Sequence, residues 1–171
     1  MFHVVTGGSG SGKSAFAEQC ILDCQGSKRI YIATMYPFDE ESYRRIARHR
    51  AMRAEKKFTT IERYTDLEHL TIPQGADVLL ECMSNLTANE IYRPDGAGEQ
   101  TADSIVDGVE ELCSRCEHVV IVTNEVCSEC TRDSADMIRN KKMLSEVNRR
   151  LAQKADWVTE VVYGIPVEVK R

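Results

Sequence analysis

Short apolar runs alternate with amphipathic segments along most of the chain. The apolar runs are rich in β-branched residues and are bounded by turn residues, which is typical of buried strands. They lie at residues 2–7, 29–35, 58–63, 76–82 and 118–125. The amphipathic segments carry apolar residues at helical spacing. They predict helices at residues 13–25, 39–57, 101–116 and about 135–155.

The chain ends with "WVTEVVYGIPVEVK", two strand-like runs on either side of a Gly-Ile-Pro turn, and predicts an antiparallel hairpin at a sheet edge. Because strands and helices alternate before this hairpin, we expect an α/β fold with a mainly parallel sheet flanked by helices. With 171 residues, the chain is most simply a single domain over 1–171. Residues 92–103 predict a loop.

One motif points directly to chemistry: "GGSGSGKS" at residues 7–14. It matches the phosphate-binding pattern G-x4-G-K-[ST] and lies between a predicted strand and a predicted helix, as that pattern requires. Glycines let backbone N–H groups approach phosphate oxygens, and the start of the next helix favours negative charge. Lys13 would reach the β- and γ-phosphates, and the Ser14 hydroxyl would bind Mg2+. The predicted nucleoside triphosphate site is formed by Gly7, Gly8, Ser9, Gly10, Ser11, Gly12, Lys13 and Ser14.

Such a site needs an acidic side chain near the metal, normally at the end of a neighbouring strand. Glu81 ends the run "VLLE", and Glu125 ends "VIVTNE". In an open α/β sheet both would lie at the same edge as the phosphate-binding loop. The sequence alone leaves open which of the two approaches the metal.

Composition narrows the class of protein. Hydrophobic residues make up 42% of the chain and charged residues 29%, which is typical of a globular protein. The formal net charge of −5 argues against a nucleic-acid binder. No apolar run reaches the roughly 18–20 residues that span a membrane, and the N-terminus does not resemble a signal peptide. We therefore expect a cytoplasmic protein with no membrane span.

Seven cysteines require an explanation. Their odd number, without a secretory signal, favours reduced thiols. Four of them have the spacing of a zinc ribbon: Cys113, Cys116, Cys127 and Cys130. However, the strand-like run between the two pairs would hold them about 26 Å apart. A zinc site is therefore disfavoured, and the sequence does not settle whether these thiols bind anything.

The segment "RRIARHRAMR" at 44–53 concentrates five arginines around His49. Taken alone, it is typical of a solvated basic helix. A nucleic-acid patch is less favoured because aromatic residues do not interleave with the arginines. A third interpretation is a phosphate-handling site, since the helix is expected to begin near the nucleotide edge of the sheet. Composition and spacing do not decide among the three.

Several motifs together resemble one enzyme family. They occur in its order and spacing: "VVTGGSGSGKSAFAE", "YIATMYPFDEESYRRIARHRAMR", "VLLECMSNLTAN", "VIVTNEV", "VNRRLAQKAD" and "VVYGIPVEVK". The chain resembles the bifunctional adenosylcobinamide kinase/adenosylcobinamide-phosphate guanylyltransferases of cobalamin biosynthesis, which have a RecA-like P-loop NTPase fold. The resemblance implies that ATP or GTP phosphorylates adenosylcobinamide. A histidine, here His49, would then carry GMP from GTP to adenosylcobinamide-phosphate, giving adenosylcobinamide-GDP.

The resemblance also implies a set of site residues. His49 and Lys13 would be catalytic, and Ser14 and Glu81 would hold Mg2+. Beyond the phosphate-binding loop, the nucleotide contacts would be Thr34, Met35, Tyr36, Arg50, Ala51, Met52, Arg53, Glu62 and Glu81. The partners implied are the corrinoid substrates and further copies of the chain in a homotrimer, with no nucleic acid.

Two segments depart from the family's usual pattern: "CSECTRDSAD" at 127–136 and "NKKMLSEVNRR" at 140–150. We expect corrinoid or subunit contacts there. One alternative function is a P-loop kinase for another small molecule, without guanylyltransferase activity. Another is a regulatory protein that binds nucleotides or nucleic acid and carries a cysteine metal site.

Overall fold

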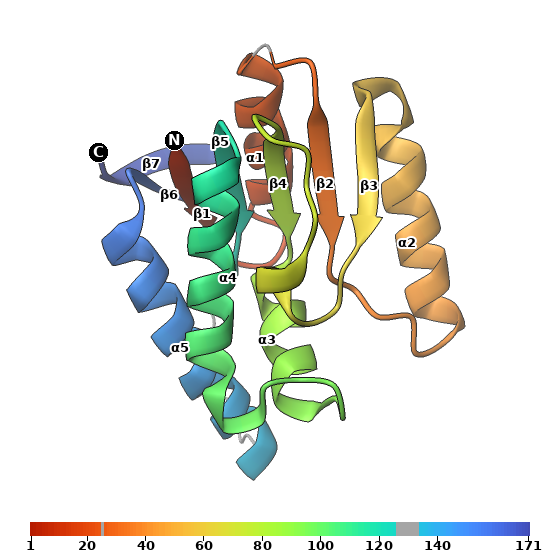
Figure 1. Cartoon of the computed structure of the whole chain (residues 1–171), viewed down its shortest axis with the longest axis vertical. Helices are drawn as coiled ribbons and strands as arrows, with labels where there is room; N and C mark the ends of the chain where they lie inside the picture. Colours follow the sequence, from red (N-terminus) through yellow and green to blue (C-terminus); the bar gives the residue numbers. More distant parts are fainter. Residues whose placement is uncertain (25, 126–133) are drawn as a thin grey trace.

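The computed structural model describes residues 1–24, 26–125 and 134–171, apart from the side chains of Arg45, His49, Met52, Arg53 and Ala54. Seven strands form one sheet with the order β3-β2-β4-β5-β1-β6-β7 (Figure 1). The strands are β1 (Phe2–Thr6), β2 (Arg29–Ala33), β3 (Phe58–Glu62), β4 (Asp77–Glu81), β5 (His118–Val122), β6 (Trp157–Val162) and β7 (Ile165–Lys170). All neighbouring strands are parallel except the β6–β7 hairpin.

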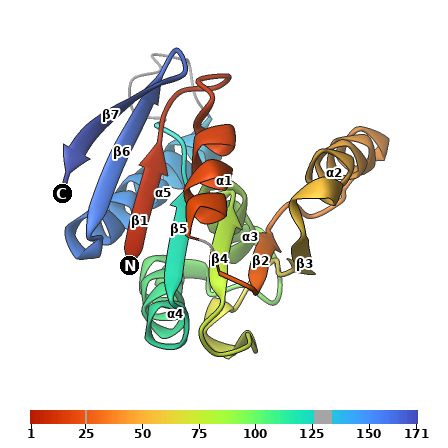
Figure 2. The same cartoon turned by 90° about the horizontal axis from the view of Figure 1, so that it is seen from above.

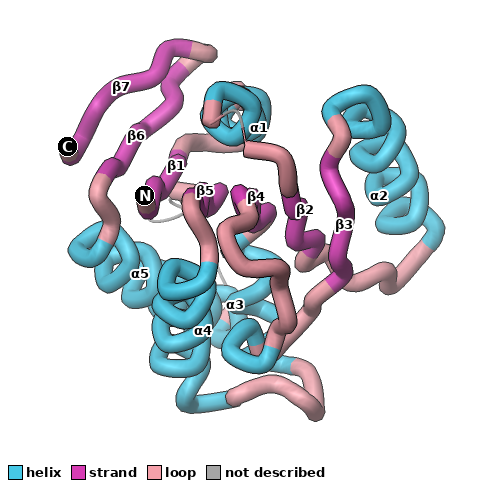
Figure 3. The backbone as a smooth tube through the Cα atoms, turned by 45° about the horizontal axis from the view of Figure 1, so that its top comes forward, coloured by secondary structure: helices cyan, strands magenta, loops and turns pink. Residues whose placement is uncertain are grey.

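Helices cover both faces of this sheet. They are α1 (Lys13–Asp23), α2 (Glu40–Arg53), α3 (Met83–Tyr92), α4 (Thr101–Arg115) and α5 (Ala135–Lys154). Short 3-10 helices are η1 (Ala54–Lys56), η2 (Leu67–His69) and η3 (Gly98–Gln100). Helix α1 covers one face, whereas α3, α4 and α5 cover the other, and α2 lies beyond the β3 edge (Figures 2 and 3).

The two faces of the sheet bury two separate apolar clusters. In β4, Val78 and Leu80 join the larger cluster under α3, α4 and α5, whereas Leu79 joins the smaller one under α1. Strand β5 alternates in the same way. Because successive side chains point to opposite faces and both faces are covered, these strands are continuously apolar in sequence. This explains why the sequence pattern located the central strands so clearly.

The predicted α/β fold with a mainly parallel sheet and a C-terminal hairpin is confirmed. The predicted strands and helices are all present, although several end a few residues earlier. The helix expected over 39–57 ends at Arg53 and is followed by η1. The prediction of a loop over 92–103 was wrong in part, since η3 and the start of α4 fall within it. That the chain forms a single domain stays a prediction.

The sequence pattern does not predict helix α3. Its sequence "MSNLTANEIY" follows β4 almost directly and contains serine, threonine and two asparagines, which have modest helix propensity. Met83 and Leu86 stabilise the helix by packing in the larger apolar cluster against the sheet, and Ile91, Asn89 and Glu90 are also buried. Tertiary packing therefore overrides the weak local signal.

In the described part of the chain, no helix has both the length and the apolar character needed to cross a membrane.

Candidate functional site

The phosphate-binding loop joins β1 to α1 and turns sharply at its glycines. Gly10 and Gly12 have φ angles of 71° and 92°, a region that favours glycine. A Cβ atom at Gly7 would lie 2.6 Å from both Ser11 Oγ and the Val161 carbonyl oxygen, so the loop has no room for a side chain there. Lys13 Nζ donates a hydrogen bond to the Gly8 carbonyl oxygen at 3.0 Å. The lysine therefore already folds back over the loop.

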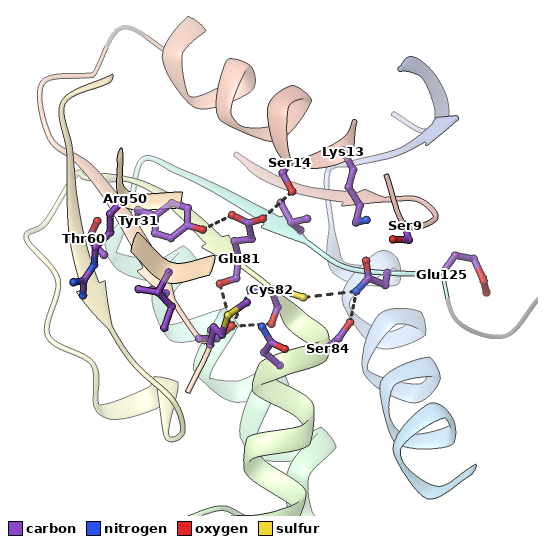
Figure 4. Close-up of a pocket in the computed structure, with 17 residues that line it drawn as sticks. Ser9, Lys13, Ser14, Tyr31, Arg50, Thr60, Glu81, Cys82, Ser84 and Glu125 are labelled. Carbon is purple, nitrogen blue, oxygen red and sulfur yellow. Dashed lines mark hydrogen bonds between the residues drawn. The ribbon is translucent and has the colours of Figure 1, made fainter. Parts of the chain in front are cut away.

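A cavity of about 400 Å³ opens beside this loop, at the carboxyl edge of the parallel strands (Figure 4). Its walls come from the phosphate-binding loop, the ends of β2, β4 and β5, and the neighbouring helices α2 and α3. Its lining residues include Ser9, Lys13, Ser14, Tyr31, Thr34, Met35, Ile46, Arg50, Thr60, Glu81, Cys82, Ser84, Asn85, Asn124 and Glu125. This is the place where open α/β sheets bind ligands.

Glu81 approaches the phosphate-binding loop more directly than the sequence could show. The Ser14 hydroxyl donates a hydrogen bond of 2.7 Å to Glu81 Oε1, and the Tyr31 hydroxyl donates to Glu81 Oε2. Hydroxyl and carboxylate oxygens are the ligands that Mg2+ takes in proteins, usually together with substrate phosphates. In the described part of the chain, no three His, Cys, Asp or Glu side chains form a metal-binding group. The donor set of Ser14 and Glu81 thus fits Mg2+ bound with a nucleotide.

Lys13 lies in a partly desolvated position. Burial lowers the pKa of Lys13 below its ordinary value, whereas its electrostatic interactions with the neighbouring Cys82 and Glu81 act to raise it. A desolvated ammonium group is stabilised when an anion approaches it. The cavity is therefore suited to an anionic group such as a phosphate.

Thr34 ties the ends of β2 and β4 together. Its Oγ1 accepts a hydrogen bond from the Cys82 backbone N–H at 2.8 Å and lies 3.0 Å from the Glu81 carbonyl oxygen. Asn89 Nδ2, from α3, donates to the Thr34 carbonyl oxygen at 2.8 Å. Because Thr34 is fully buried, it serves to hold Glu81 and Cys82 in the cavity wall.

A second network fixes the opposite wall. Asn124 Nδ2 donates to Ser84 Oγ at 2.7 Å, and Asn148 Nδ2 donates to the Asn124 carbonyl oxygen at 3.2 Å. Asn148 also accepts a 2.7 Å bond from the Thr123 hydroxyl. These contacts join the end of β5 to α3 and α5. They position Asn124, and its neighbour Glu125, on the side of the cavity away from α2.

Helix α2 contributes the remaining wall through Ile46 and Arg50. Arg50 forms an ion pair with Glu62 at the end of β3, and the Tyr64 hydroxyl donates to Glu62 Oε2 at 2.9 Å. The Arg50 and Glu62 side chains are 53% and 41% exposed, so solvent screens this pair. The backbone of His49 immediately precedes Arg50 on α2. Its side chain lies outside the described residues.

Most of the residues expected at the site meet in the cavity or form its phosphate-binding loop. The cavity brings together Ser9, Lys13, Ser14, Thr34, Met35, Arg50 and Glu81, and Glu125 lines it too. Glu62 does not line the cavity itself, but it forms an ion pair with Arg50, which does. Tyr36 packs instead against neighbouring aromatic rings, and Ala51 is exposed on α2. The side chains of Met52 and Arg53 lie outside the described residues.

The sequence pattern does not indicate several of the residues that line the cavity. Tyr31, Thr60, Cys82, Ser84, Asn85 and Asn124 were not selected as site residues. Ser84 and Asn85 directly follow the "VLLEC" strand, and their position after a strand end was an available signal. Tyr31 and Thr60 lie within strands, where no local pattern distinguishes them. Only the pairing of the strands brings them to the cavity.

The cysteines of the possible zinc site are only partly described. Burial raises the pKa of Cys113 and of Cys116 to about 11, and both thiols are free. Cys127 and Cys130 lie outside the described residues. The expectation that no zinc binds here stays a prediction.

Comparison with known proteins identifies the relatives of this chain. The family model described as cobinamide kinase / cobinamide phosphate guanyltransferase matches residues 3–169. The chain belongs to this family. The resemblance that the sequence motifs indicated is therefore confirmed, and members of the cobinamide kinase / cobinamide phosphate guanyltransferase family are kinases and nucleotidyltransferases.

Two curated relatives are similar over their full length. The bifunctional adenosylcobalamin biosynthesis protein CobU of Escherichia coli is 35% identical, and that of Salmonella typhimurium is 33% identical. Each comparison covers 99% of this chain and 100% of the relative. Among solved structures, a DnaB-like replicative helicase matches 93% of this chain and 47% of its own, with a TM-score of 0.50 and 13% identity. This last likeness concerns the fold alone.

Proposed function

We propose that this protein phosphorylates adenosylcobinamide and then transfers GMP from GTP to the resulting phosphate, through a guanylylated His49. The family membership and the full-length similarity to two bifunctional enzymes support the proposal. The observation that carries it is the cavity in which Lys13, Ser14 and Glu81 face Arg50 of α2. Phosphate-binding groups and the basic helix meet there in one site.

In the kinase reaction, the acceptor hydroxyl oxygen forms a bond to the γ-phosphorus of the nucleotide. The bond from that phosphorus to the β–γ bridging oxygen breaks, and the hydroxyl proton is released. Lys13 stabilises the charge that develops on the phosphate oxygens. Ser14 and Glu81 would hold Mg2+, which supplies positive charge to the same oxygens. Tyr31 keeps the Glu81 carboxylate oriented through its hydrogen bond.

In the guanylyltransferase reaction, an imidazole nitrogen of His49 forms a bond to the α-phosphorus of GTP, and pyrophosphate leaves. A phosphate oxygen of the acceptor then attacks this phosphorus, the P–N bond breaks, and the imidazole is regenerated. Position 49 lies three residues after Ile46 and directly before Arg50, both of which line the cavity. Residues three apart on a helix are neighbours on its surface. This backbone placement supports the role of His49.

The same proposal includes the remaining expectations from the sequence. GTP and ATP serve as substrates and Mg2+ as cofactor, in a cytoplasmic homotrimer that binds no nucleic acid. The single domain over 1–171 carries both reactions, so the kinase and guanylyltransferase steps share one cavity.

The test uses GTP labelled at the α-phosphate. We expect an acid-labile, base-stable protein–GMP adduct in the wild-type protein and none in His49→Asn. His69→Asn is the matched control, because His69 is exposed and bonds to Asp66, and neither residue lines the cavity. A normal adduct in His49→Asn would exclude His49 as the carrier. If the wild-type protein phosphorylates the acceptor but forms no adduct, it is a kinase without guanylyltransferase activity.

A further inference from the structure

A second cavity lies at the amino ends of the parallel strands, whereas the candidate nucleotide site lies at their carboxyl ends. His3, His118 and Trp157 line it at the starts of β1, β5 and β6. Its volume is about 580 Å³, compared with about 400 Å³ for the first cavity. In the described part of the chain, the two cavities share no lining residue. We call the second one the amino-end cavity, and its volume is typical of sites for small organic molecules.

The amino-end cavity is enclosed by α1 on one side and by the β6–β7 hairpin on the other. Phe16 and Cys20 contribute to the α1 wall, and both pack against the smaller apolar cluster of the sheet. Trp157 and Thr159 of β6 and Glu168 of β7 contribute to the hairpin wall. Figure 3 shows α1 and the hairpin on either side of β1. The cavity is therefore built on ordered helix and strand backbone.

Three rings form a fixed, largely apolar part of the lining. The ring centroid of His3 lies 6.1 Å from that of Phe16 and 5.8 Å from that of Trp157, and the ring planes meet at 89° and 87°. Such edge-to-face contacts are favourable and hold the rings in place. His3 is only 5% exposed, so its ring is locked in the wall. A wall ordered in this way loses little conformational entropy when a ligand binds.

The polar groups of this wall favour a neutral ligand. Burial lowers the pKa of His3 below its ordinary value. The His3 Nε2 lies 2.9 Å from Thr159 Oγ1, so the two polar groups satisfy each other. At the rim, the Arg171 guanidinium lies 4.0 Å from the Glu168 carboxylate. Surroundings that disfavour the charged form of an imidazole also disfavour an ionised ligand.

His118 supplies a polar contact for such a ligand. Its Nδ1 lies 2.7 Å from Asp77 Oδ1, and the Asp77 side chain is only 2% exposed. Because a carboxylate only accepts hydrogen bonds, Nδ1 donates, and the Nε2 of a neutral imidazole can accept a further bond. The buried carboxylate also fixes the orientation of the ring. His118 therefore gives the amino-end cavity one positioned hydrogen-bond acceptor.

We propose that the amino-end cavity is a second ligand-binding site, for a small neutral molecule with an apolar ring body and a hydroxyl or N–H group that donates to His118 Nε2. The ring body lies between α1 and the hairpin, against Phe16 and Trp157. No residue of the phosphate-binding loop takes part, so the proposal stands independently of the proposed function. This ligand and a nucleotide bind at the same time.

Trp157 reports directly on this site, because it is the only tryptophan in the sequence and lines the cavity. Its indole N–H gives a single peak in an N–H correlation spectrum of isotope-labelled protein. The probes are phenol, toluene and benzoate. We expect phenol to shift the peak saturably, and toluene to bind about 10-fold more weakly because it lacks the hydrogen bond. Benzoate, which is ionised, should cause no saturable shift over the same concentrations.

His118→Asn removes the proposed contact and keeps the internal one. The asparagine side-chain N–H can take the place of Nδ1 toward Asp77, but asparagine has no counterpart of Nε2. We expect the dissociation constant of phenol to rise about 10-fold and that of toluene to stay unchanged. His69→Asn is the matched control, because His69 is exposed and does not line the amino-end cavity. If His118→Asn fails to fold, the comparison of phenol with toluene in the wild type still decides.

Four results would overturn the proposal. The first is the absence of a saturable shift with phenol. The second is equal binding of phenol and toluene in the wild type, or unchanged phenol binding in His118→Asn. The third is displacement of phenol by GTP, which would place the probe in the nucleotide cavity. The fourth is an indole peak that moves on dilution of the protein without any probe, because a second copy of the chain would then cover the cavity.

Discussion

The Ser14 hydroxyl lies 2.7 Å from Glu81 Oε1, although the two residues are 67 positions apart. Ser14 is the second residue of α1 and Glu81 ends β4, so the contact joins the end of the phosphate-binding loop to a strand two places away from β1 in the sheet. It selects Glu81 as the carboxylate nearest the serine that would bind Mg2+. Glu125 lines the same cavity but lies on its other side, next to Asn124.

Substitution of Ser14 by alanine should strongly reduce both reactions. Without the hydroxyl, the proposed Mg2+ site would lose one of the two side chains that would hold the ion, and we expect kcat to fall by about 100-fold or more. Steady-state assays at saturating nucleotide and Mg2+ measure this. Ser114→Ala is a matched control, since Ser114 is exposed and donates a hydrogen bond to the Glu111 carbonyl oxygen of its own helix. Activity within twofold of the wild type in Ser14→Ala would contradict the assignment.

Tyr31→Phe should weaken the binding of Mg2+ more than the binding of the nucleotide. The Tyr31 hydroxyl donates to Glu81 Oε2, and outer partners of this kind typically change metal affinity or activity by about 10–100-fold. We expect the Mg2+ concentration for half-maximal activity to rise by about 10-fold. Titration with Mg2+ at fixed nucleotide measures it, with Tyr163→Phe as the control. An unchanged Mg2+ requirement would mean that Tyr31 does not position the carboxylate.

Loss of the Arg50–Glu62 ion pair should change the stability of the protein little and its activity strongly. Because both side chains are about half exposed, Arg50→Ala should change the free energy of unfolding by less than about 1 kcal/mol. GMP loading should nevertheless fall at least 10-fold if Arg50 stabilises the transferring phosphoryl group. Arg44→Ala is the control, since Arg44 pairs with Glu40 on the same helix at high exposure. Equal GMP loading in the two variants would show that Arg50 does not stabilise the transferring phosphoryl group.

Glu90→Gln tests the link that Glu90 makes between the loop after β3, through Asp66, and the loop after α3, through Ala97. Both carboxylate oxygens of Glu90 accept backbone N–H groups, and the side chain is buried. The side-chain amide of glutamine would place its NH2 group against one of these backbone N–H groups, and one hydrogen bond would be lost. The free energy of unfolding should therefore fall by about 1–3 kcal/mol. Urea denaturation measures the change, with the exposed Glu110→Gln as control. Stability equal to that of the control would show that the two loops are held in another way.

Buried thiols should make the protein less stable at alkaline pH. Burial raises the pKa of Cys20, Cys113 and Cys116 to about 11 each, whereas an exposed thiol in the unfolded chain has a pKa of about 8.5. Between these values the folded state retains protons that the unfolded state has lost. The stabilisation is therefore complete below about pH 8.5 and is lost as the pH rises toward 11.

Urea denaturation under reducing conditions at pH 8, 9 and 10 measures this dependence. We expect the free energy of unfolding to fall with pH in the wild type, and to fall less steeply in Cys113→Ala. Comparison of the two slopes removes the contribution of other titrating groups. Parallel pH profiles would show that the Cys113 thiol does not ionise on unfolding in this range.

Local patterns were sufficient for much of the architecture. The phosphate-binding loop is a continuous motif, and the central strands are apolar on both faces, so each is visible within a short window of sequence. Helix α3 was not, because its polar residues have weak helix propensity and its apolar residues gain stability only against the sheet. The packing of Tyr36 against Tyr64 and Arg93 likewise has no local sign, since these two residues reach it from the loops after β3 and after α3.

The sequence by itself determined the type of chemistry: a glycine-rich loop with Lys13 and Ser14 between a strand and a helix, and a basic helix around His49. The tertiary structure decided which side chains share the cavity, including the choice of Glu81 for Ser14 and the entry of Tyr31 and Arg50. The physical reason lies in the strand order. Parallel strands bring their carboxyl ends to one edge, but non-local pairing decides which ends become neighbours, and no short stretch of sequence specifies that pairing.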